Sequence, residues 1–245
     1  IRDAAALARI LRGARPEIVL HLAAQAFVGR AHREPAATFA TNVAGTVNLL
    51  EALRGQPGVA AALVVTSDKV YRNDGAGRAF VESDPLGGED PYSASKAAAE
   101  IAVASWRASF ARDLPPLATA RAGNVIGGGD FGEGRIIPDL VRAALAGETL
   151  LVRRPDATRP FQHVLDVLRG YLLMTERLAA GSAPEARGMV TPPALNFGPR
   201  DGEIRVRDLL ALGGGVAWRQ EAGPVMPEAP RLALDSGLAA RMLGW

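Results

Sequence analysis

Residues 60–71 read AAALVVTSDKVY. The first part of this stretch is a short, uncharged apolar run, which is typical of a strand buried on both faces of a parallel sheet. The run ends at Thr66, and a polar triplet follows at once: Ser67, Asp68 and Lys69. Ligands bind outside the carboxyl ends of parallel strands. The stretch therefore predicts both a central strand and the start of a functional site.

Strands and helices alternate along the rest of the chain. Further strands are predicted at 17–22, 117–121, 149–152, 194–197 and 215–219, beside the one at 60–66. Helices are predicted at 4–13, 35–54, 92–110, 136–146, 163–179, 205–212 and 236–243. Alternation of this kind predicts an α/β fold with a doubly wound, parallel, Rossmann-like sheet. Pro- and Gly-rich segments at 183–193 and 223–230 are predicted to be surface loops.

The composition excludes several classes of protein. The chain has 245 residues, 48% hydrophobic and 22% charged, which is typical of a globular protein. Its longest apolar run, 59–65, is far shorter than the roughly 20 residues of a spanning helix. A net charge of +2, with arginines spread along the chain, does not favour nucleic-acid binding. With no cysteine and no ligand-pair spacing among the three histidines, we expect no metal.

A second polar motif opens the helix predicted at 92–110. Tyr92 and Lys96 are neighbours on one helix face, and Lys96 is one of only two lysines in the chain. An ammonium beside a phenol favours the phenolate, and lowering the pKa of a tyrosine from about 10 to about 7 requires about 4 kcal/mol. Such a tyrosine can take a proton from a sugar hydroxyl while hydride leaves the same carbon. The alternative is an exposed pair without function, but Ser67 at a strand end favours a site.

Seven segments carry a resemblance to a known family and follow its order. They are PEIVLHLAAQAFV (16–28), NVAGTVNLLE (42–51), VTSDKVY (65–71), DPLGGEDPYSASK (84–96), ARAGNVIGGGD (120–130), RPFQHVL (159–165) and NFG (196–198). The chain resembles the extended short-chain dehydrogenase/reductases that act on nucleotide sugars, and within them the CDP-glucose 4,6-dehydratases. The Ser-Asp-Lys triplet is one of the specific motifs, because sister enzymes for dTDP-glucose carry Thr-Asp-Glu there.

The resemblance also implies a domain organisation. Residues 1–122, joined by parts of 160–198, would form the NAD-binding domain, and 123–245 would mostly bind the nucleotide sugar. The glycine-rich dinucleotide fingerprint and its βα unit would precede Ile1, so we expect them to be missing from this chain. Residues 127–132 match GxGxxG formally. We reject them as the fingerprint, because residues 124–126 separate them from the strand and no acidic residue ends a following strand.

The same resemblance implies roles for single residues. NAD would be the cofactor, contacted by Ile1, Leu22, Ala23, Ala24, Thr66, Tyr92 and Lys96. Tyr92 and Lys96 would be the acid–base pair, with Ser67 beside the sugar and Asp68 protonating the departing 6-hydroxyl. Lys69 stands where the sister enzymes have the base for the C5 proton. It would either have a depressed pKa or stabilise the enolate, and the sequence leaves both open. Substrate contacts would be Asn124, Arg159 and Asn196, while Asn42 would tie neighbouring backbone together and His21 and His163 would be structural.

The expected reaction is NAD-dependent dehydration of CDP-glucose to CDP-4-keto-6-deoxyglucose, with internal hydride transfer from C4 to C6. A 4-epimerase or decarboxylase on the same scaffold is the nearest alternative, but it needs no acid at C6, so Asp68 and Lys69 argue against it. A non-catalytic nucleotide-sugar sensor is the alternative of another class, and the presence of Ser67, Tyr92 and Lys96 argues against that. We expect a cytoplasmic homodimer whose partner is a nucleotide sugar, with no nucleic-acid or membrane partner.

Overall fold

The structure is a computed structural model that describes residues 1–181, 192–222, 229 and 231–245. The loops predicted at 183–193 and 223–230 lie almost entirely outside these residues. Within the described part of the chain, no helix is both long and apolar enough to cross a membrane.

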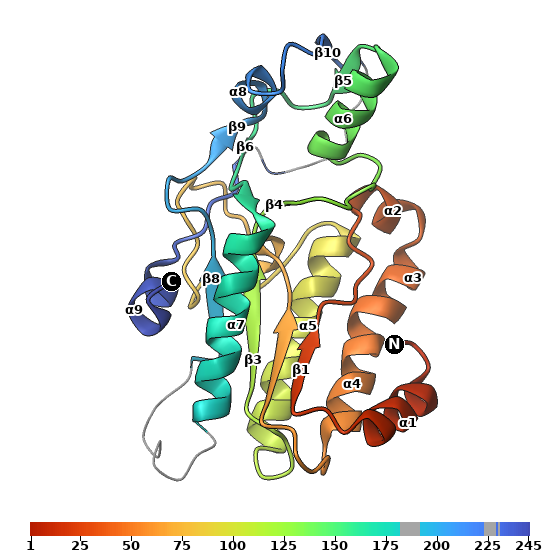
Figure 1. The fold of residues 1–245 in the computed structure, drawn as a ribbon, viewed down its shortest axis with the longest axis vertical. Helices are drawn as coiled ribbons and strands as arrows, with labels where there is room; N and C mark the ends of the chain where they lie inside the picture. Colours follow the sequence, from red (N-terminus) through yellow and green to blue (C-terminus); the bar gives the residue numbers. More distant parts are fainter. Residues whose placement is uncertain (182–191, 223–228, 230) are drawn as a thin grey trace.

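Four parallel strands form the central sheet, in the order β1-β2-β3-β8 (Figure 1). Their bounds are β1 Ile18–His21, β2 Ala61–Val65, β3 Leu117–Ala122 and β8 Ala194–Phe197. In the register of the sheet, Leu63 of β2 lies beside Leu20 of β1 on one side and Ala118 of β3 on the other. The parallel sheet predicted from the sequence is therefore confirmed.

Helices cover both faces of this sheet (Figure 1). One face is covered by α1 (Ala4–Ala14), α4 (Gly45–Leu53) and α5 (Pro91–Ser109), and the other by α7 (Val164–Ala180) and α9 (Gly237–Leu243). Successive residues of β2 point to opposite faces: Ala62 and Val64 join the first core, and Ala61 and Leu63 join the second. Because both faces are covered, every position of β2 has to be apolar, which explains the unbroken run in the sequence.

The long helix predicted at 35–54 is three consecutive pieces. They are α3 (Pro35–Phe39), a π-helical segment η1 (Ala40–Ala44) and α4, and a short α2 (Val28–Arg33) that we did not predict precedes them. At the widened turn, Asn42 is buried and its side chain bonds to Gln25 and Ser95 instead of facing solvent. Such π-helical turns occur frequently at functional sites.

A group of small elements lies beyond the carboxyl ends of the strands, at the top of Figure 1. It contains β4 (Val125–Ile126), α6 (Ile136–Ala146), β5 (Leu150–Val152), β6 (Thr158–Arg159), β7 (Gln162–His163), β9 (Ile204–Arg205), α8 (Val206–Ala211) and β10 (Trp218–Gln220). The pair β5–β10 is parallel and β6–β9 is antiparallel. Part of this group has its own apolar cluster, which includes Leu140, Leu150 and Leu210. The domain boundary at residue 122 remains a prediction.

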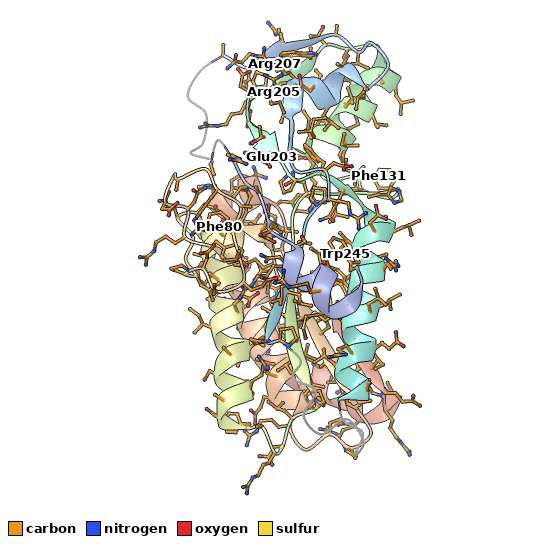
Figure 2. All side chains as sticks on the ribbon, turned by 90° about the vertical axis from the view of Figure 1, so that its left-hand side faces the viewer. Phe80, Phe131, Glu203, Arg205, Arg207 and Trp245 are labelled. Atoms are coloured by element: carbon orange, nitrogen blue, oxygen red, sulfur yellow. The ribbon has the colours of Figure 1, made fainter. Side chains whose placement is uncertain are left out.

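The C-terminal residue packs against α7 (Figure 2). The indole of Trp245 donates a hydrogen bond to the main-chain oxygen of Asp166 at 2.9 Å. Its ring packs edge-on against the Phe197 ring, with 5.1 Å between the ring centroids. A Cβ on Gly170 would come within 2.5 Å of the Phe197 ring and 2.9 Å of Trp245. The glycine on α7 therefore makes room for two aromatic rings below the carboxyl end of β8.

Candidate active site

A cavity of about 1140 Å³ lies at the carboxyl ends of β2 and β3. Seven of the residues predicted for the site line it: Thr66, Ser67, Asp68, Lys69, Tyr92, Asn124 and Arg159. They come from the end of β2, the start of α5, the segment after β3, and β6. The structure thus brings together residues that are up to 93 positions apart in the sequence, at the edge of the sheet where ligands bind.

The polar triplet after β2 forms a 3-10 turn, η2 (Asp68–Val70). The Ser67 hydroxyl accepts a hydrogen bond from the Lys69 main-chain N–H at 3.2 Å and donates one to Asp68 Oδ1 at 3.1 Å. Asp68 is 4% exposed, and its second oxygen, Oδ2, is buried without a hydrogen-bond partner among the described residues. Burial raises the pKa of Asp68, against the opposing effects of Lys69, Ser67 and Arg159. A carboxyl group in this setting can hold a proton and deliver it.

Tyr92 and Lys96 occupy the first turns of α5, which begins at Pro91 after the N-cap Asp90. The Asp90 carboxylate accepts hydrogen bonds from the main-chain N–H groups of Tyr92 at 2.9 Å and Ser93 at 3.1 Å. This cap fixes where the helix begins and so where the phenol stands relative to β2. Both Tyr92 and Lys96 are buried, at 9% and 6% exposure.

The electrostatics of this pair differ from the prediction. Burial raises the pKa of Tyr92 to about 12, although the nearby Ser67 hydroxyl opposes the shift. Burial also lowers the pKa of Lys96 to about 8, partly offset by Glu100. The Lys96 ammonium donates a hydrogen bond to the main-chain oxygen of Val65 at 3.0 Å. The expectation that the Lys96 ammonium favours the Tyr92 phenolate is not met in the protein without ligand, because burial raises the pKa of the phenol.

Two predicted supporting residues hold this region together. Asn42 accepts a hydrogen bond from the Gln25 N–H at 2.8 Å and donates to the Gln25 carbonyl at 3.0 Å and to the Ser95 hydroxyl at 2.9 Å. The expectation that Asn42 ties neighbouring backbone together is thus confirmed. His21 lies 3.1 Å from the Thr46 hydroxyl through Nε2, and burial lowers its pKa to about 4. The ring is neutral near pH 7, as a structural histidine would be.

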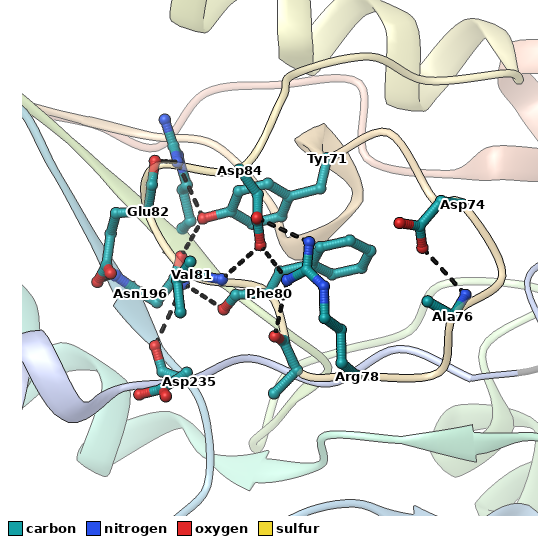
Figure 3. A network of polar contacts seen from close by, with 12 residues as sticks. Tyr71, Asp74, Ala76, Arg78, Phe80, Val81, Glu82, Asp84, Asn196 and Asp235 are labelled. Atoms are coloured by element: carbon teal, nitrogen blue, oxygen red, sulfur yellow. Dashed lines mark hydrogen bonds and ion pairs between the residues drawn. The ribbon is translucent and has the colours of Figure 1, made fainter.

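Asn196 does not fit its predicted role. It is fully buried and does not line the cavity. Its Nδ2 donates to the main-chain oxygens of Phe80 at 2.9 Å and Asp235 at 3.3 Å, and its Oδ1 accepts from the Tyr71 hydroxyl at 2.6 Å (Figure 3). These contacts occupy both ends of the amide, so the prediction of a substrate contact is corrected here to a structural one.

The residues predicted for the remote parts of the cofactor lie near β1 and α4. Leu22, Ala23 and Ala24 directly follow β1, and Leu22 is 50% exposed. The side chain of Ile1 packs over Gly45, and its main-chain oxygen accepts a hydrogen bond from Asn48 at 3.1 Å. These four residues lie outside the cavity that holds Tyr92, and their cofactor contacts remain predictions.

The rejected glycine motif lines the cavity as a loop before α6. A Cβ on Gly127 would meet Val164 at 2.6 Å, and one on Gly132 would meet Phe27 at 2.3 Å. These two glycines are needed for close packing against α7 and against the residue that precedes α2. His163, just before α7, accepts a hydrogen bond from the Leu165 N–H at 3.2 Å and so caps that helix.

Two features of the cavity were missed from the sequence. Tyr171 of α7 lines it at 5% exposure, close enough for the charges of Tyr92 and Asp68 to add to the burial that raises its pKa. Its ring packs edge-on against Phe197 at 5.5 Å. The wall is also basic. It contains eight basic side chains, Arg30, Arg33, Lys69, Arg135, Arg142, Arg153, Arg154 and Arg159, against four carboxylates. No local sequence motif indicates either feature, because each arises only when segments far apart in the sequence come together in the fold.

Comparisons with known proteins agree with this geometry. The family model described as "NAD dependent epimerase/dehydratase family" matches residues 1–188. CDP-glucose 4,6-dehydratase from Salmonella typhimurium strain LT2 is 37% identical over 257 residues, covering all of this chain and 70% of the relative. A dTDP-glucose 4,6-dehydratase from Neisseria gonorrhoeae is 34% identical over 269 residues, covering all of this chain and 74% of the relative.

Solved structures show the same fold. A double mutant of a dTDP-glucose 4,6-dehydratase from Streptomyces venezuelae, solved with NAD bound, superposes with a TM-score of 0.83 at 27% identity, over all of this chain and 71% of that one. A UDP-glucose 4-epimerase from Thermus thermophilus, also in complex with NAD, superposes with a TM-score of 0.83. The two chains are 26% identical, and the match covers all of this chain and 76% of the epimerase. The predicted Rossmann-like fold and family resemblance are confirmed: the chain belongs to the NAD dependent epimerase/dehydratase family.

Proposed function

We propose that this protein is a lyase that dehydrates a nucleotide sugar, converting CDP-glucose to CDP-4-keto-6-deoxyglucose with NAD as cofactor. The observation that carries the proposal is Asp68. Its carboxyl group lines the same cavity as Tyr92, is 4% exposed, and has one oxygen without a partner among the described residues. A 4-epimerase has no use for such an acid, whereas loss of the 6-hydroxyl as water requires a proton.

The residues around Lys96 fit the nicotinamide end of NAD. Lys96 is 6% exposed, and the hydrogen bond to Val65 uses one of the three donors of its ammonium. Ser67 and Tyr92 line the cavity and Lys96 does not; we propose that the other donors of Lys96 act with the two hydroxyls on the hydroxyls of a ribose. When bound, NAD supplies the acceptor for the C4 hydride and returns that hydride at C6.

In our proposal, Tyr92 accepts the proton of the sugar 4-hydroxyl. Its pKa of about 12 in the protein alone leaves the phenolate scarce at neutral pH. Bringing that pKa to about 7 needs roughly 7 kcal/mol of additional stabilisation of the phenolate. A cationic group bound beside the phenol, together with a charged Lys96, has the right sign to provide it.

Asp68 then gives its proton to the departing 6-hydroxyl. The raised pKa of Asp68 suits this step, because it favours the protonated form of the acid. Lys69 lies in the same cavity and follows Asp68 in η2. We propose that it acts at C5, either as a neutral base that takes the C5 proton and returns it once hydride has reached C6, or by stabilising the enolate beside the 4-ketone while solvent water takes and returns that proton.

The basic wall of the cavity supports a substrate that carries a diphosphate. Guanidinium groups bind phosphate oxygens through two parallel hydrogen bonds, and seven arginines line the cavity. We assign diphosphate binding to Arg159, which is 5% exposed, and a supporting contact to Asn124. The choice of CDP rests on the resemblance and on the 37% identical relative.

The direct test uses CDP-glucose carrying deuterium at C4 and less than one equivalent of NAD. We expect complete conversion to a 4-keto-6-deoxy sugar with deuterium in the C6 methyl group, observed by NMR. A product epimerised at C4, or consumption of one NAD per sugar, would contradict the proposal. The same incubation with dTDP-glucose tests the nucleotide preference.

We further propose that the protein works as a homodimer in the cytoplasm, as the family resemblance implies. Light scattering coupled to size-exclusion chromatography measures the mass in solution, and a monomer at working concentration would contradict the first part. Fractionation of the source cells tests the second.

A further inference from the structure

A buried ion pair lies directly beneath the proposed site. Glu100 is on α5, one helical turn after Lys96, and Arg121 is on β3. Their side chains are 4% and 6% exposed. The guanidinium makes two contacts with the carboxylate, from Nε to Oε1 at 3.0 Å and from Nη2 to Oε2 at 2.9 Å. This geometry fixes the carboxylate in direction as well as in position.

Two threonine hydroxyls complete the surroundings of this carboxylate. Thr66 Oγ1 donates to Oε1 at 2.5 Å, and Thr119 Oγ1 donates to Oε2 at 2.8 Å. Each oxygen of Glu100 therefore accepts two hydrogen bonds. Because Thr66 directly follows β2 and precedes Ser67, Glu100 ties the helix that carries Tyr92 to the strand end that carries the polar triplet.

The other side of Arg121 anchors a second region. Its Nη1 donates to the Tyr71 hydroxyl at 2.9 Å and to the main-chain oxygen of Glu82 at 3.0 Å. The Tyr71 hydroxyl donates in turn to Asn196 of β8, as Figure 3 shows. Although burial disfavours a charge, the bonds to Glu100 raise the pKa of Arg121, so the guanidinium stays charged. The carboxylate is therefore held by a rigid cation.

Glu100 also acts on Lys96. The Lys96 ammonium donates to the carbonyl of Val65, the residue before the one bound by Glu100. Burial lowers the pKa of Lys96 to about 8, and the negative charge of Glu100 opposes that effect. Without this carboxylate, the ammonium would lose its proton at a lower pH. Glu100 thus controls both the charge of Lys96 and the backbone that Lys96 contacts.

We propose that Glu100, held by Arg121, is a positioning residue that keeps Lys96 protonated and holds the strand end carrying Ser67 and Asp68 at its distance from Tyr92. This inference rests on the proposed function for its consequence in catalysis. A pair that served the fold alone would behave differently. Buried ion pairs are often replaced by apolar groups of similar size without loss of stability, so a folded double variant of a purely structural pair would keep nearly the wild-type kcat.

The sequence offers a direct way to observe Lys96. Only two lysines occur in the chain, so selective 15N-lysine labelling gives two side-chain NMR signals, and the K69R variant assigns them. Titratable groups that interact electrostatically with Lys96 include Glu100 on its own helix and His21 from β1. His21 is neutral above pH 6 and does not interfere, since its pKa is about 4.

The principal variant is the double substitution Glu100→Gln with Arg121→Met, which removes both charges and keeps side chains of similar length. Glu100→Gln alone is the second variant, and it leaves Arg121 charged without its partner. The matched control is Tyr71→Phe, which removes one hydrogen bond from Arg121 and leaves the charge of Glu100 in place. Thermal melting shows which variants are folded before any titration is interpreted.

In the wild type we expect Lys96 to titrate with a midpoint near 8. The midpoint should fall in the double variant, fall further in Glu100→Gln, and stay unchanged in Tyr71→Phe. In turnover, the double variant should lose about 10²-fold in kcat with KM within about twofold, because small displacements of reacting groups have effects of this size.

A folded double variant with the wild-type Lys96 midpoint would overturn the inference. So would a folded Glu100→Gln variant that keeps the wild-type Lys96 midpoint. The titration does not depend on turnover. If the wild-type protein does not dehydrate CDP-glucose, the proposed function fails, while the effect of Glu100 on Lys96 is still measured.

Discussion

Replacing Asp68 by asparagine should separate the two halves of the proposed reaction. Asparagine has nearly the same shape, and its Oδ1 can still accept the hydrogen bond that Ser67 donates at 3.1 Å. The amide cannot deliver a proton as a carboxylic acid does. Oxidation at C4 should therefore proceed while loss of the 6-hydroxyl slows by about 10²–10⁴-fold, the usual contribution of a general acid.

The structure also limits the effect on stability. In the wild type, Asp68 Oδ2 already lacks a partner among the described residues, so the amide exchanges one unpaired buried atom for another. We expect the free energy of unfolding to change by no more than about 1 kcal/mol. Because the pKa of Asp68 is raised in the fold, the folded state binds more protons than the unfolded state above pH 3.8. This contribution to wild-type stability falls as pH rises from 3.8 through the raised pKa, and Asp68→Asn should abolish that decline.

The assay is a single turnover with CDP-glucose, followed by nicotinamide absorbance. The variant should accumulate reduced cofactor and 4-keto sugar on the enzyme. Asp139→Asn is the matched control, because Asp139 lines the same cavity and is paired with Arg142. If Asp68→Asn turns over at nearly the wild-type rate and only its melting temperature changes, Asp68 is a local structural residue. The epimerase alternative would then explain the site better.

Other substitutions test other parts of the molecule. Tyr92→Phe should show neither product nor bound reduced cofactor, with turnover lowered about 10²–10⁴-fold; rapid reduction of cofactor by the variant would refute its role as the base. Tyr171→Phe keeps the aromatic ring but removes a hydroxyl from the cavity wall, so we expect kcat to fall and the melting temperature to stay the same. An unchanged kcat would exclude the hydroxyl from catalysis. Gly127→Ala puts a methyl group 2.6 Å from a side-chain atom of α7 and should lower the free energy of unfolding by about 1–3 kcal/mol, whereas Gly128→Ala, with nothing within 4 Å, should be nearly neutral by denaturant melts. The pKa of His21 falls from 6.5 to about 4 on folding, so its contribution of about 3 kcal/mol should be lost as pH falls through that window, and His21→Gln should remove this part of the pH dependence of stability.

The sheet and the centre of the site could be predicted because local rules govern both. An apolar run covered on both faces has to be an internal strand, and the polar residues at its carboxyl end have to face the ligand side. These two rules placed Ser67, Asp68 and Lys69. The pair on α5 followed from helical spacing, and the helix predicted from residue 92 begins one residue earlier, at Pro91.

Asn196 could not be placed correctly, because its surroundings come from segments far away in the sequence. Its partners are Tyr71, Phe80 and Asp235, separated from it by 125, 116 and 39 positions. A strand residue near the carboxyl edge has no local signal that distinguishes a ligand contact from a buried network. The basic wall of the cavity was missed for the same reason, since its arginines lie on segments from α2 to β6.

The ionisation of Tyr92 depends on burial, which a local sequence motif does not indicate. Spacing on a helix places Tyr92 and Lys96 one turn apart on α5, but burial acts on both groups at once and drives their pKa values apart, to about 12 for the phenol and about 8 for the ammonium. Burial keeps the phenol neutral and brings the pKa of the ammonium closer to neutral pH. Burial also raises the pKa of Asp68 and so favours its protonated form, which is the state that elimination requires. Desolvation therefore prepares the acid for the second half of the reaction and disfavours the base for the first. In the proposed mechanism, positive charge that arrives with the ligands and negative charge from Glu100 correct this imbalance, so the proton of the 4-hydroxyl is taken only when the site is filled.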